Sequence, residues 1–369
     1  MSEPGSNPPG PWAMGIGNGV SIAPQASGHP RPSRDLARGL GLPSWRGCVN
    51  AGWFPRICVL AGVAQLAEAP GLGPGQCAFE SRRRHEVVVP SGGWHPVAMP
   101  EGHTIHRLAK DLRGDLGGQA LHVSAAQSRS EATAALLDGH VLRRTEAWGK
   151  HLFLTFDSRS VLHVHLGLIG KWFRRRPSRI DGAIAEPRAT TRLRLSPTEG
   201  DPLAWDLIGP MLATVITPAD KRAVMARLGP DPLRPDADPE KTWAKLQRSG
   251  KPVGLLLMEQ DVVAGIGNVY RSELLNIVGV DPRRPGKAVQ RDEFDALWTE
   301  TVRQLKLGVK RNRIVTMSAE DLPRPVSKLR RGEGRYAYKQ EHCGRCGTRL
   351  DVYPIAGRTT WSCPTCQPR

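Results

Sequence analysis

Pro100 and Glu101 combine a potential nucleophile with a potential proton donor. A proline nitrogen inside a peptide bond is inert, but removal of Met99 would leave Pro100 with a free secondary amine. Such an amine attacks an aldehyde-like carbon and gives an iminium directly. At a helix start the positive end of the helix dipole disfavours the protonated amine, so more of it is nucleophilic at neutral pH. Because Met-Pro-Glu is short and occurs by chance, its chemistry needs support from other residues.

Four of the seven cysteines form two Cys-x2-Cys pairs separated by sixteen residues: Cys343 and Cys346, then Cys363 and Cys366. Four thiolates at this spacing match the tetrahedral coordination of a structural zinc ion. We expect one Zn²⁺ in a closed site that organises a small module and does no catalysis. A redox pair and metal-free thiols are the alternatives, and the glycines and proline at the knuckles argue against both.

A third signal lies between residues 255 and 271, where apolar runs flank Gly265 and Gly267. The pattern predicts a helix, a tight turn with free backbone N–H groups, and a second helix capped by Asn268. Helix N-termini of this kind bind anions such as DNA phosphates. No strand precedes the turn and a third glycine is missing, so a dinucleotide-binding fold is not indicated. A plain connection between helices is the alternative.

The elements that must position these residues begin with an amphipathic helix from Pro100, which the glycines at 114–118 should end. Apolar or alternating runs then predict an antiparallel sandwich, because no long helix separates them. The expected strands cover 141–148, 151–156, 161–166, 191–195 and 203–206. The expected helices cover 220–227, 238–247, 253–259, 269–278 and 291–307, and a hairpin is expected at 352–353 and 359–361.

The net charge of +17 favours a polyanionic partner, with a generally basic proteome or a basic tail as the alternative. The apolar runs are too short to span a membrane. With no recognisable signal peptide, we expect a cytoplasmic, nucleoid-associated monomer without membrane contacts.

Residues 1–98 are rich in Gly and Pro and contain no lysine, so we expect a disordered or wrongly annotated extension. Back-translation of residues 62–68 and 79–81 can be written to resemble the D-arm and T-loop of a bacterial tRNA gene. The hypothesis is that the reading frame was extended through such a gene and that translation begins at Met99. A coincidental low-complexity linker is the alternative, and the genomic nucleotide sequence decides between them.

From Met99 to the end, the chain resembles bacterial DNA glycosylase/AP lyases of the formamidopyrimidine-DNA glycosylase and endonuclease VIII type. The resemblance combines Met-Pro-Glu-Gly at 99–102, Leu-Gly-Pro-Asp-Pro-Leu at 228–233, the turn at 265–268 and the cysteine module. It implies an α+β fold with a catalytic antiparallel β-sandwich domain led by a helix (99–218). A helix-two-turn-helix DNA-binding domain (219–312) and a zinc-finger hairpin (333–369) would follow.

The resemblance also implies roles for single residues. Pro100 would form a Schiff base after removal of Met99, and Glu101 would donate the proton for base release. Lys150 would serve β-elimination, although alone it would be an ordinary surface lysine. Arg358 would serve δ-elimination, although an arginine at a turn is usually just solvated.

Further residues match DNA-contacting positions of the family, namely Arg227 and Asn268. Leu168 matches an apolar wedge that fills the gap left by an everted base, with a buried strand leucine as the alternative. Gly167 departs from the polar residue that some endonuclease VIII proteins carry there. His103 follows the first motif closely enough to line a lesion pocket.

The resemblance therefore implies a bifunctional glycosylase/AP lyase of base excision repair, acting on duplex DNA with oxidised bases or abasic sites. The start Gly-His-Thr-Ile is similar to the endonuclease VIII branch, which favours oxidised pyrimidines. Three alternatives stay open. They are an oxidised-purine glycosylase for 8-oxoguanine and formamidopyrimidine, a non-catalytic damaged-DNA-binding protein with a blocked Pro100, and an RNA-binding zinc-ribbon protein.

Overall fold

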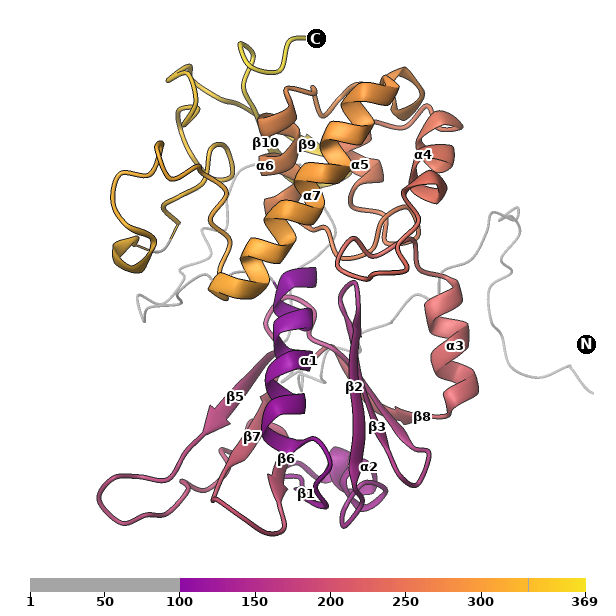
Figure 1. The fold of residues 1–369 in the computed structure, drawn as a ribbon, viewed down its shortest axis with the longest axis vertical. Coiled ribbons are helices and arrows are strands. Elements are labelled where there is room, and N and C mark those ends of the chain that lie inside the picture. The colour runs from indigo at the N-terminus through magenta and orange to yellow at the C-terminus, as the bar shows by residue number, and fades with distance from the viewer. Residues whose placement is uncertain (1–99, 331) are drawn as a thin grey trace, which may run out of the picture. The chain divides into compact units, whose positions relative to one another are not determined.

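Helix α1 (Gly102–Leu116) begins directly after the Pro100–Glu101 pair (Figure 1). The computed structural model describes residues 100–330 and 332–369, which belong to one compact unit. Met99 and the expected extension 1–98 lie outside the described residues. The helix ends at Leu116, which is fully buried, and Gly117 is its C-cap. This end lies within the stretch 114–118 whose glycines were expected to stop the helix.

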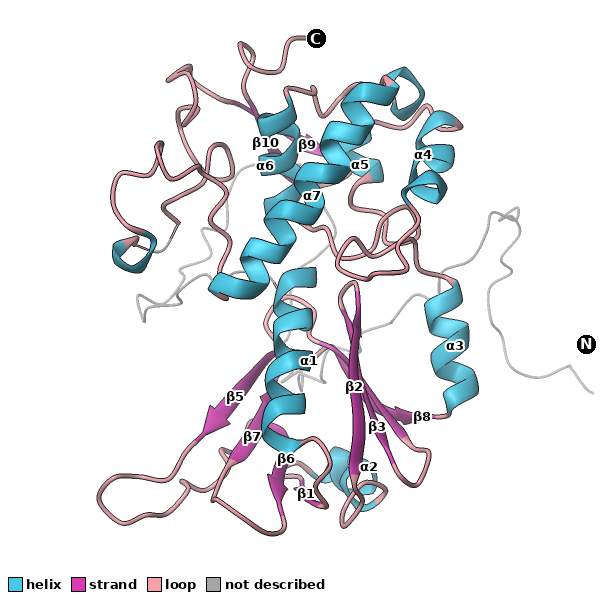
Figure 2. Cartoon of the chain, viewed as in Figure 1, coloured by secondary structure: helices cyan, strands magenta, loops and turns pink. Residues whose placement is uncertain are grey.

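Two four-stranded antiparallel sheets form the sandwich that was expected (Figure 2). Its core combines apolar side chains of α1 and of both sheets. One sheet has the order β1 (Leu121–Ser124), β6 (Thr191–Pro197), β7 (Ala204–Ile208) and β5 (Lys171–Arg175). The other has the order β2 (Leu142–Trp148), β3 (His151–Phe156), β4 (Val161–His165) and β8 (Leu212–Ile216). Short helical turns η1 (Ser128–Ser130) and α2 (Glu131–Ala135) follow β1.

A helical region follows, with a second core around Tyr270, Leu274 and Phe294. Its helices are α3 (Pro218–Ala226), α4 (Pro239–Gln247), α5 (Val253–Leu256), α6 (Asn268–Val278) and α7 (Arg291–Arg311). Two 3₁₀ turns, η2 (Gly286–Ala288) and η3 (Val326–Lys328), lie on either side of α7.

The helical region differs from expectation at several helix boundaries. Helix α5 stops at Leu256, three residues before the expected end, and α7 continues to Arg311, four residues beyond the expected end. The N-cap of α6 is Gly267, so the expectation that Asn268 caps this helix was wrong. The side chain that satisfies the first N–H groups of α6 comes instead from Glu101, far away in the sequence.

The C-terminal hairpin pairs β9 (Asp351–Ile355) with β10 (Arg358–Ser362). Its two-residue turn places Ala356 at φ 47° and Gly357 at φ 73°. Two left-handed residues in a row are the geometry that matches the twist of a hairpin. Arg358 is therefore the first residue after the turn. The described parts of the chain, taken together, confirm an α+β fold of sandwich, helical region and cysteine-bearing hairpin.

Among residues 100–330 and 332–369, every helix is too short or too polar to span a lipid bilayer.

Candidate active site and metal centre

The carboxylate of Glu101 lies at the N-terminus of α6 and is 1% exposed. Its oxygens accept backbone hydrogen bonds from Gly267 N (2.7 Å), Val269 N (2.9 Å) and Tyr270 N (3.4 Å). These N–H groups have no partner within the helix, so the glutamate caps α6 from outside. Burial raises the pKa of the Glu101 carboxyl, although Lys150 and the three N–H groups act in the opposite direction. A raised pKa suits a proton donor.

Lys150 is the second residue of the two-residue turn between β2 and β3, and its Nζ donates to Ile266 O at 2.6 Å. Burial lowers the pKa of its ammonium group, while the nearby Glu101 charge opposes this effect and the Arg358 charge adds to it. The structure therefore brings Glu101 and Arg358 within electrostatic reach of Lys150. They come from the start of α1, the β2–β3 turn and the terminal hairpin.

Three glycines make this convergence possible. An added Cβ at Gly102 would lie 2.9 Å from Gly265 Cα, and one at Gly149 would lie 2.8 Å from Ala264 Cβ. Gly149 has φ 55° and Gly265 has φ 101°, in the region where side chains are strained. The Gly102 N–H also donates to Gly265 O at 2.8 Å. The three backbones thus touch directly behind the site.

The segment 228–233 also supports the Lys150 turn, through the buried Asp231. Asp231 Oδ2 accepts from Gly149 N at 2.7 Å and lies 2.7 Å from His106 Nε2 on α1. Trp148 Nε1 donates to Gly229 O at 3.0 Å. Sequence reasoning quoted this segment as a motif but gave Asp231 no role. The motif itself was the available signal.

A cavity of about 920 Å³ opens beside Pro100. The ring of His103 lines it, packs edge-on against Tyr270 with centroids 5.3 Å apart, and is nearly fully buried. Burial lowers the pKa of His103 to about 3, so this imidazole is neutral at pH 7. His103 thus lines a cavity next to Pro100, and its role in a lesion pocket stays a prediction. Aromatic and basic side chains complete the wall, among them Trp172, Tyr338, Arg335 and Arg174.

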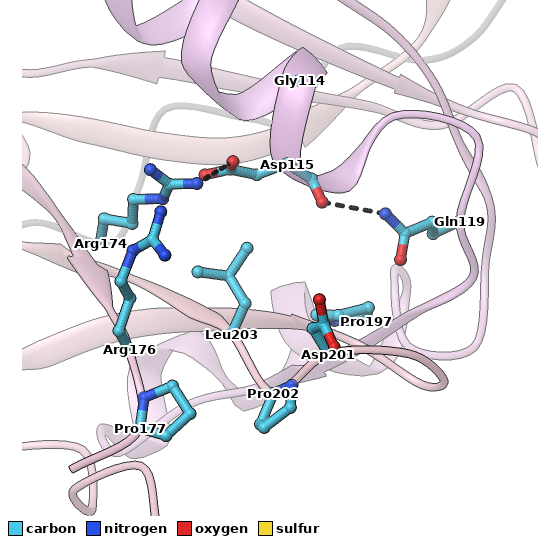
Figure 3. Close-up of a pocket in the computed structure, with 10 residues that line it drawn as sticks. All are labelled: Gly114, Asp115, Gln119, Arg174, Arg176, Pro177, Pro197, Asp201, Pro202 and Leu203. Carbon is cyan, nitrogen blue, oxygen red and sulfur yellow. Dashed lines mark hydrogen bonds and ion pairs between the residues drawn. The ribbon is translucent and has the colours of Figure 1, made fainter. Parts of the chain in front are cut away.

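A second cavity of about 560 Å³ lies at the other end of α1 (Figure 3). There Asp115 pairs with Arg174, and its backbone oxygen accepts from Gln119 Nε2 at 2.9 Å. Two aspartates and two arginines line this cavity, so its negative and positive charges are equal in number. Because it contains none of the expected catalytic residues, it is not the candidate site.

Three histidines on β3 and β4 cluster next to Lys150. His151 Nδ1 and His163 Nε2 lie 2.8 Å apart, and the His151 and His165 rings have centroids 5.0 Å apart. Burial and neighbouring positive charges, Arg227 among them, lower the pKa of His151 to about 3. Arg227, the exposed C-cap of α3, is therefore close to this cluster.

Asn268 is buried, and its Nδ2 donates to Thr359 O of β10 at 3.0 Å.

Leu168 lies in the turn after β4 and is 60% exposed, which rules out the buried-leucine alternative. Ile169 and Met211 beside it are 67% and 68% exposed. A Cβ at Gly167 would touch Met211 Cβ at 2.8 Å, so the turns after β4 and β7 meet here. Sequence reasoning missed Ile169 and Met211, because contact between the turns is a tertiary feature.

The four cysteine sulfurs lie within 4.8 Å of one another. The Sγ atoms of Cys343 and Cys366 are 4.0 Å apart, and those of Cys346 and Cys363 are 3.4 Å apart. Zinc–sulfur bonds of about 2.3 Å in a tetrahedron require sulfurs about 3.8 Å apart, so the set fits zinc. Such a closed set leaves no position for substrate, and the metal would only hold the two knuckles together.

Comparison with known proteins shows which family has this fold and sequence. The model of the formamidopyrimidine-DNA glycosylase N-terminal domain matches residues 99–206, and that of its H2TH domain matches 228–319. Endonuclease 8 1 of Mycobacterium tuberculosis is 42% identical over 274 residues, covering 73% of this chain and all of that protein. The DNA-(apurinic or apyrimidinic site) lyase Nei2 of Mycolicibacterium smegmatis is 32% identical over 279 residues, covering 73% of this chain and 99% of that lyase.

A solved Lactococcus lactis Fpg, in complex with DNA containing N7-benzyl-Fapy-dG, has the same fold. Its TM-score is 0.60 at 22% identity, with 73% of this chain and all of that one covered. A sandwich and a helical region that share a buried glutamate, with a four-cysteine hairpin beside them, define a DNA glycosylase architecture. The chain belongs to the formamidopyrimidine-DNA glycosylase/endonuclease VIII family, and is a DNA glycosylase and AP lyase of base excision repair.

Proposed function

We propose that the protein excises oxidised pyrimidines from duplex DNA through a Schiff base on Pro100 and nicks the strand by β- and δ-elimination. The convergence of Pro100–Glu101, Lys150 and Arg358 carries this proposal, since distant chain segments supply an amine, an acid and two cations. The Gly-His-Thr-Ile start and the 42% identity to a protein named endonuclease 8 support the pyrimidine preference.

The chemistry follows from these groups. The Pro100 amine bonds to C1′ of the damaged nucleotide as the glycosidic bond breaks, and Glu101 gives its proton to the departing base. The C1′–O4′ bond then opens, the proton of the attacking amine is transferred to O4′, and an iminium between the proline nitrogen and C1′ remains. Loss of a C2′ proton expels the 3′ phosphate, and loss of a C4′ proton expels the 5′ phosphate. Lys150 and Arg358 stabilise these departing phosphates.

The surrounding surface suits a distorted duplex. The exposed cluster Leu168, Ile169 and Met211 fills the gap that the everted nucleotide leaves, and the cavity beside Pro100 receives the base. Arg227 and Asn268 contact phosphates. Both residues lie near the catalytic cluster, since Arg227 acts on His151 and Asn268 bonds the hairpin of Arg358.

The same proposal includes the oligomeric state and the domains of the protein. A monomer uses a catalytic domain (99–218), a helix-two-turn-helix domain (219–312) and a zinc finger (333–369) to hold the duplex. One structural Zn²⁺ on the four cysteines maintains the finger.

Single-turnover assays on matched duplexes test the proposal. Each duplex carries one 5-hydroxyuracil, one 8-oxoguanine or one abasic site, and the protein begins at Pro100. We expect excision of the pyrimidine at least about tenfold faster than that of the purine. Faster purine excision would assign the oxidised-purine class, and absence of nicking at the abasic site would leave a binding protein.

A further inference from the structure

Arg271 of α6 is a fully buried arginine that binds the strand following the fingertip turn. Its Nη2 donates to Thr359 O at 3.0 Å and to Thr360 Oγ1 at 2.8 Å, and it also bonds Asn268 Oδ1. A buried guanidinium is costly unless its donors find acceptors. Two of the acceptors come from β10 and another is Gly254 O, 3.4 Å from Nη1, while Nε has no partner among the described residues. The bonds to β10 tie the helix to the hairpin.

Thr360 continues this connection to Arg358. Its hydroxyl accepts from Arg271 and donates to Arg358 O at 3.3 Å, and the residue is fully buried. The Arg358 side chain is exposed and has no hydrogen bond or ion pair to other residues of the described chain. Its position therefore depends on its backbone, which the Arg271–Thr360 relay holds.

The helix at the origin of this relay also holds the catalytic carboxylate, because Glu101 binds the first N–H groups of α6. At its other end, Asn276 Nδ2 lies 3.7 Å from Cys343 Sγ and 3.2 Å from Gln367 Oε1. Helix α6 thus contacts the cysteine module at two points, through Arg271 at β10 and through Asn276 near the cysteines. A rigid helix with two such attachments fixes the direction of the hairpin relative to Glu101.

We propose that Arg271 and Thr360 are positioning residues that set how often δ-elimination follows β-elimination. The proposal rests on the role given to Arg358 under the proposed function. Without the relay, the turn would shift and Arg358 would miss the second departing phosphate, while Schiff-base chemistry at Pro100 would continue. A misplacement of about 1 Å can cost about a hundredfold in rate, so a loosened turn is enough.

The test measures the ratio of 3′-phosphate to 3′-unsaturated aldehyde ends formed on an abasic duplex. Thr360→Val removes the relay hydroxyl and keeps the side-chain shape. Ser362→Ala is the matched control, because it removes another buried hydroxyl of β10, which bonds Tyr353 Oη at 2.9 Å. Arg358→Ala is the reference for lost δ-elimination. Borohydride trapping and zinc content are measured on each variant.

We expect Thr360→Val to lower the ratio about three- to tenfold with trapping and zinc content unchanged, and Ser362→Ala to keep the wild-type ratio. Arg271→Lys, which keeps the charge but loses the fork of donors, should act in the same direction. A wild-type ratio in both relay variants, or loss of zinc in both, would overturn the inference. A wild-type ratio in Arg358→Ala would instead refute the proposed role of Arg358.

Discussion

Glu101 occupies two positions in the molecule at once, as the neighbour of Pro100 in sequence and as the cap of α6 in space. The carboxyl accepts three backbone N–H groups in a buried environment that raises its pKa. The first position was readable from the motif. The second was not, because Gly267 lies 166 residues away in the chain.

Glu101→Gln should lower the excision of an oxidised base by at least about a hundredfold, because the departing base loses its proton donor. Nicking of a preformed abasic site should be affected less, since no base has to leave. The control is therefore the same variant on the two duplexes. An equal loss on both would show that Glu101 acts in the elimination steps or in folding.

The direction of the Glu101 pKa shift also fixes a pH dependence. The acid must be protonated to act, and burial keeps it protonated to higher pH than an ordinary glutamate. Single-turnover excision should therefore fall as pH rises through this raised pKa, with the base-release step measured on its own. A rate that rises across that range would contradict the assignment of Glu101 as the acid.

Single residues differed in how much the sequence revealed. Pro100 and the cysteines were chosen for chemistry that is local to a few positions, and the cysteine sulfurs do converge. Asn268 was misjudged as a cap because propensity favours asparagine there, whereas the acceptor came from another segment. The sequence predicted no role for Arg271, because nothing in it indicates that this helical arginine is fully buried.

At the scale of elements, the site depends on three glycine backbones in contact at the start of α1, the β2–β3 turn and the loop before α6. Glu101 precedes Gly102 and Lys150 follows Gly149, while the loop of Gly265 contains the Ile266 carbonyl oxygen that accepts from Lys150. The contact between these backbones therefore sets the distance between the candidate catalytic groups. The glycines were visible in the sequence, but their meeting point was not.

Gly149→Ala should slow nicking of an abasic duplex by about a hundredfold, because the new methyl would lie 2.8 Å from Ala264 Cβ and displace Lys150. Gly139→Ala is the matched control: its φ is also positive, at 75°, but no atom lies within 4 Å of the added Cβ. Left-handed strain of about 1–2 kcal/mol is then common to both variants. Equal nicking rates in the two would show that the close contact does not matter.

The sequence predicted some strands of the sandwich and not others, for physical reasons. Strands β2, β3 and β4 carry buried apolar side chains and were expected. Strands β5 and β8 were not expected, because β5 reads Lys-Trp-Phe-Arg-Arg and β8 is only partly buried throughout. A strand whose pairing partners supply the stabilisation leaves little hydrophobic pattern in its own sequence. The order of the strands in the two sheets was therefore known only from the structure, whereas the α+β fold class was already expected from the sequence.

At the scale of the whole molecule, the cysteine module and the sandwich both contact α6 around the candidate site. Cys346→Ser or removal of zinc by a chelator should release the hairpin and lower nicking at least about tenfold, since Arg358 loses its place. Zinc content and nicking are measured on the same samples. Re-addition of Zn²⁺ should restore the chelated protein but not the variant, and full nicking without zinc would be inconsistent with the proposed structural role.

The central claim is that Pro100 acts as a terminal amine, and borohydride trapping on an abasic duplex tests it most directly. The protein that begins at Pro100 is compared with the 369-residue chain, in which the Pro100 nitrogen is an amide. We predict a covalent adduct with DNA for the first protein and none for the second, with both proteins binding the duplex. Equal trapping of the two proteins, or no trapping when Pro100 is the first residue, would contradict the account.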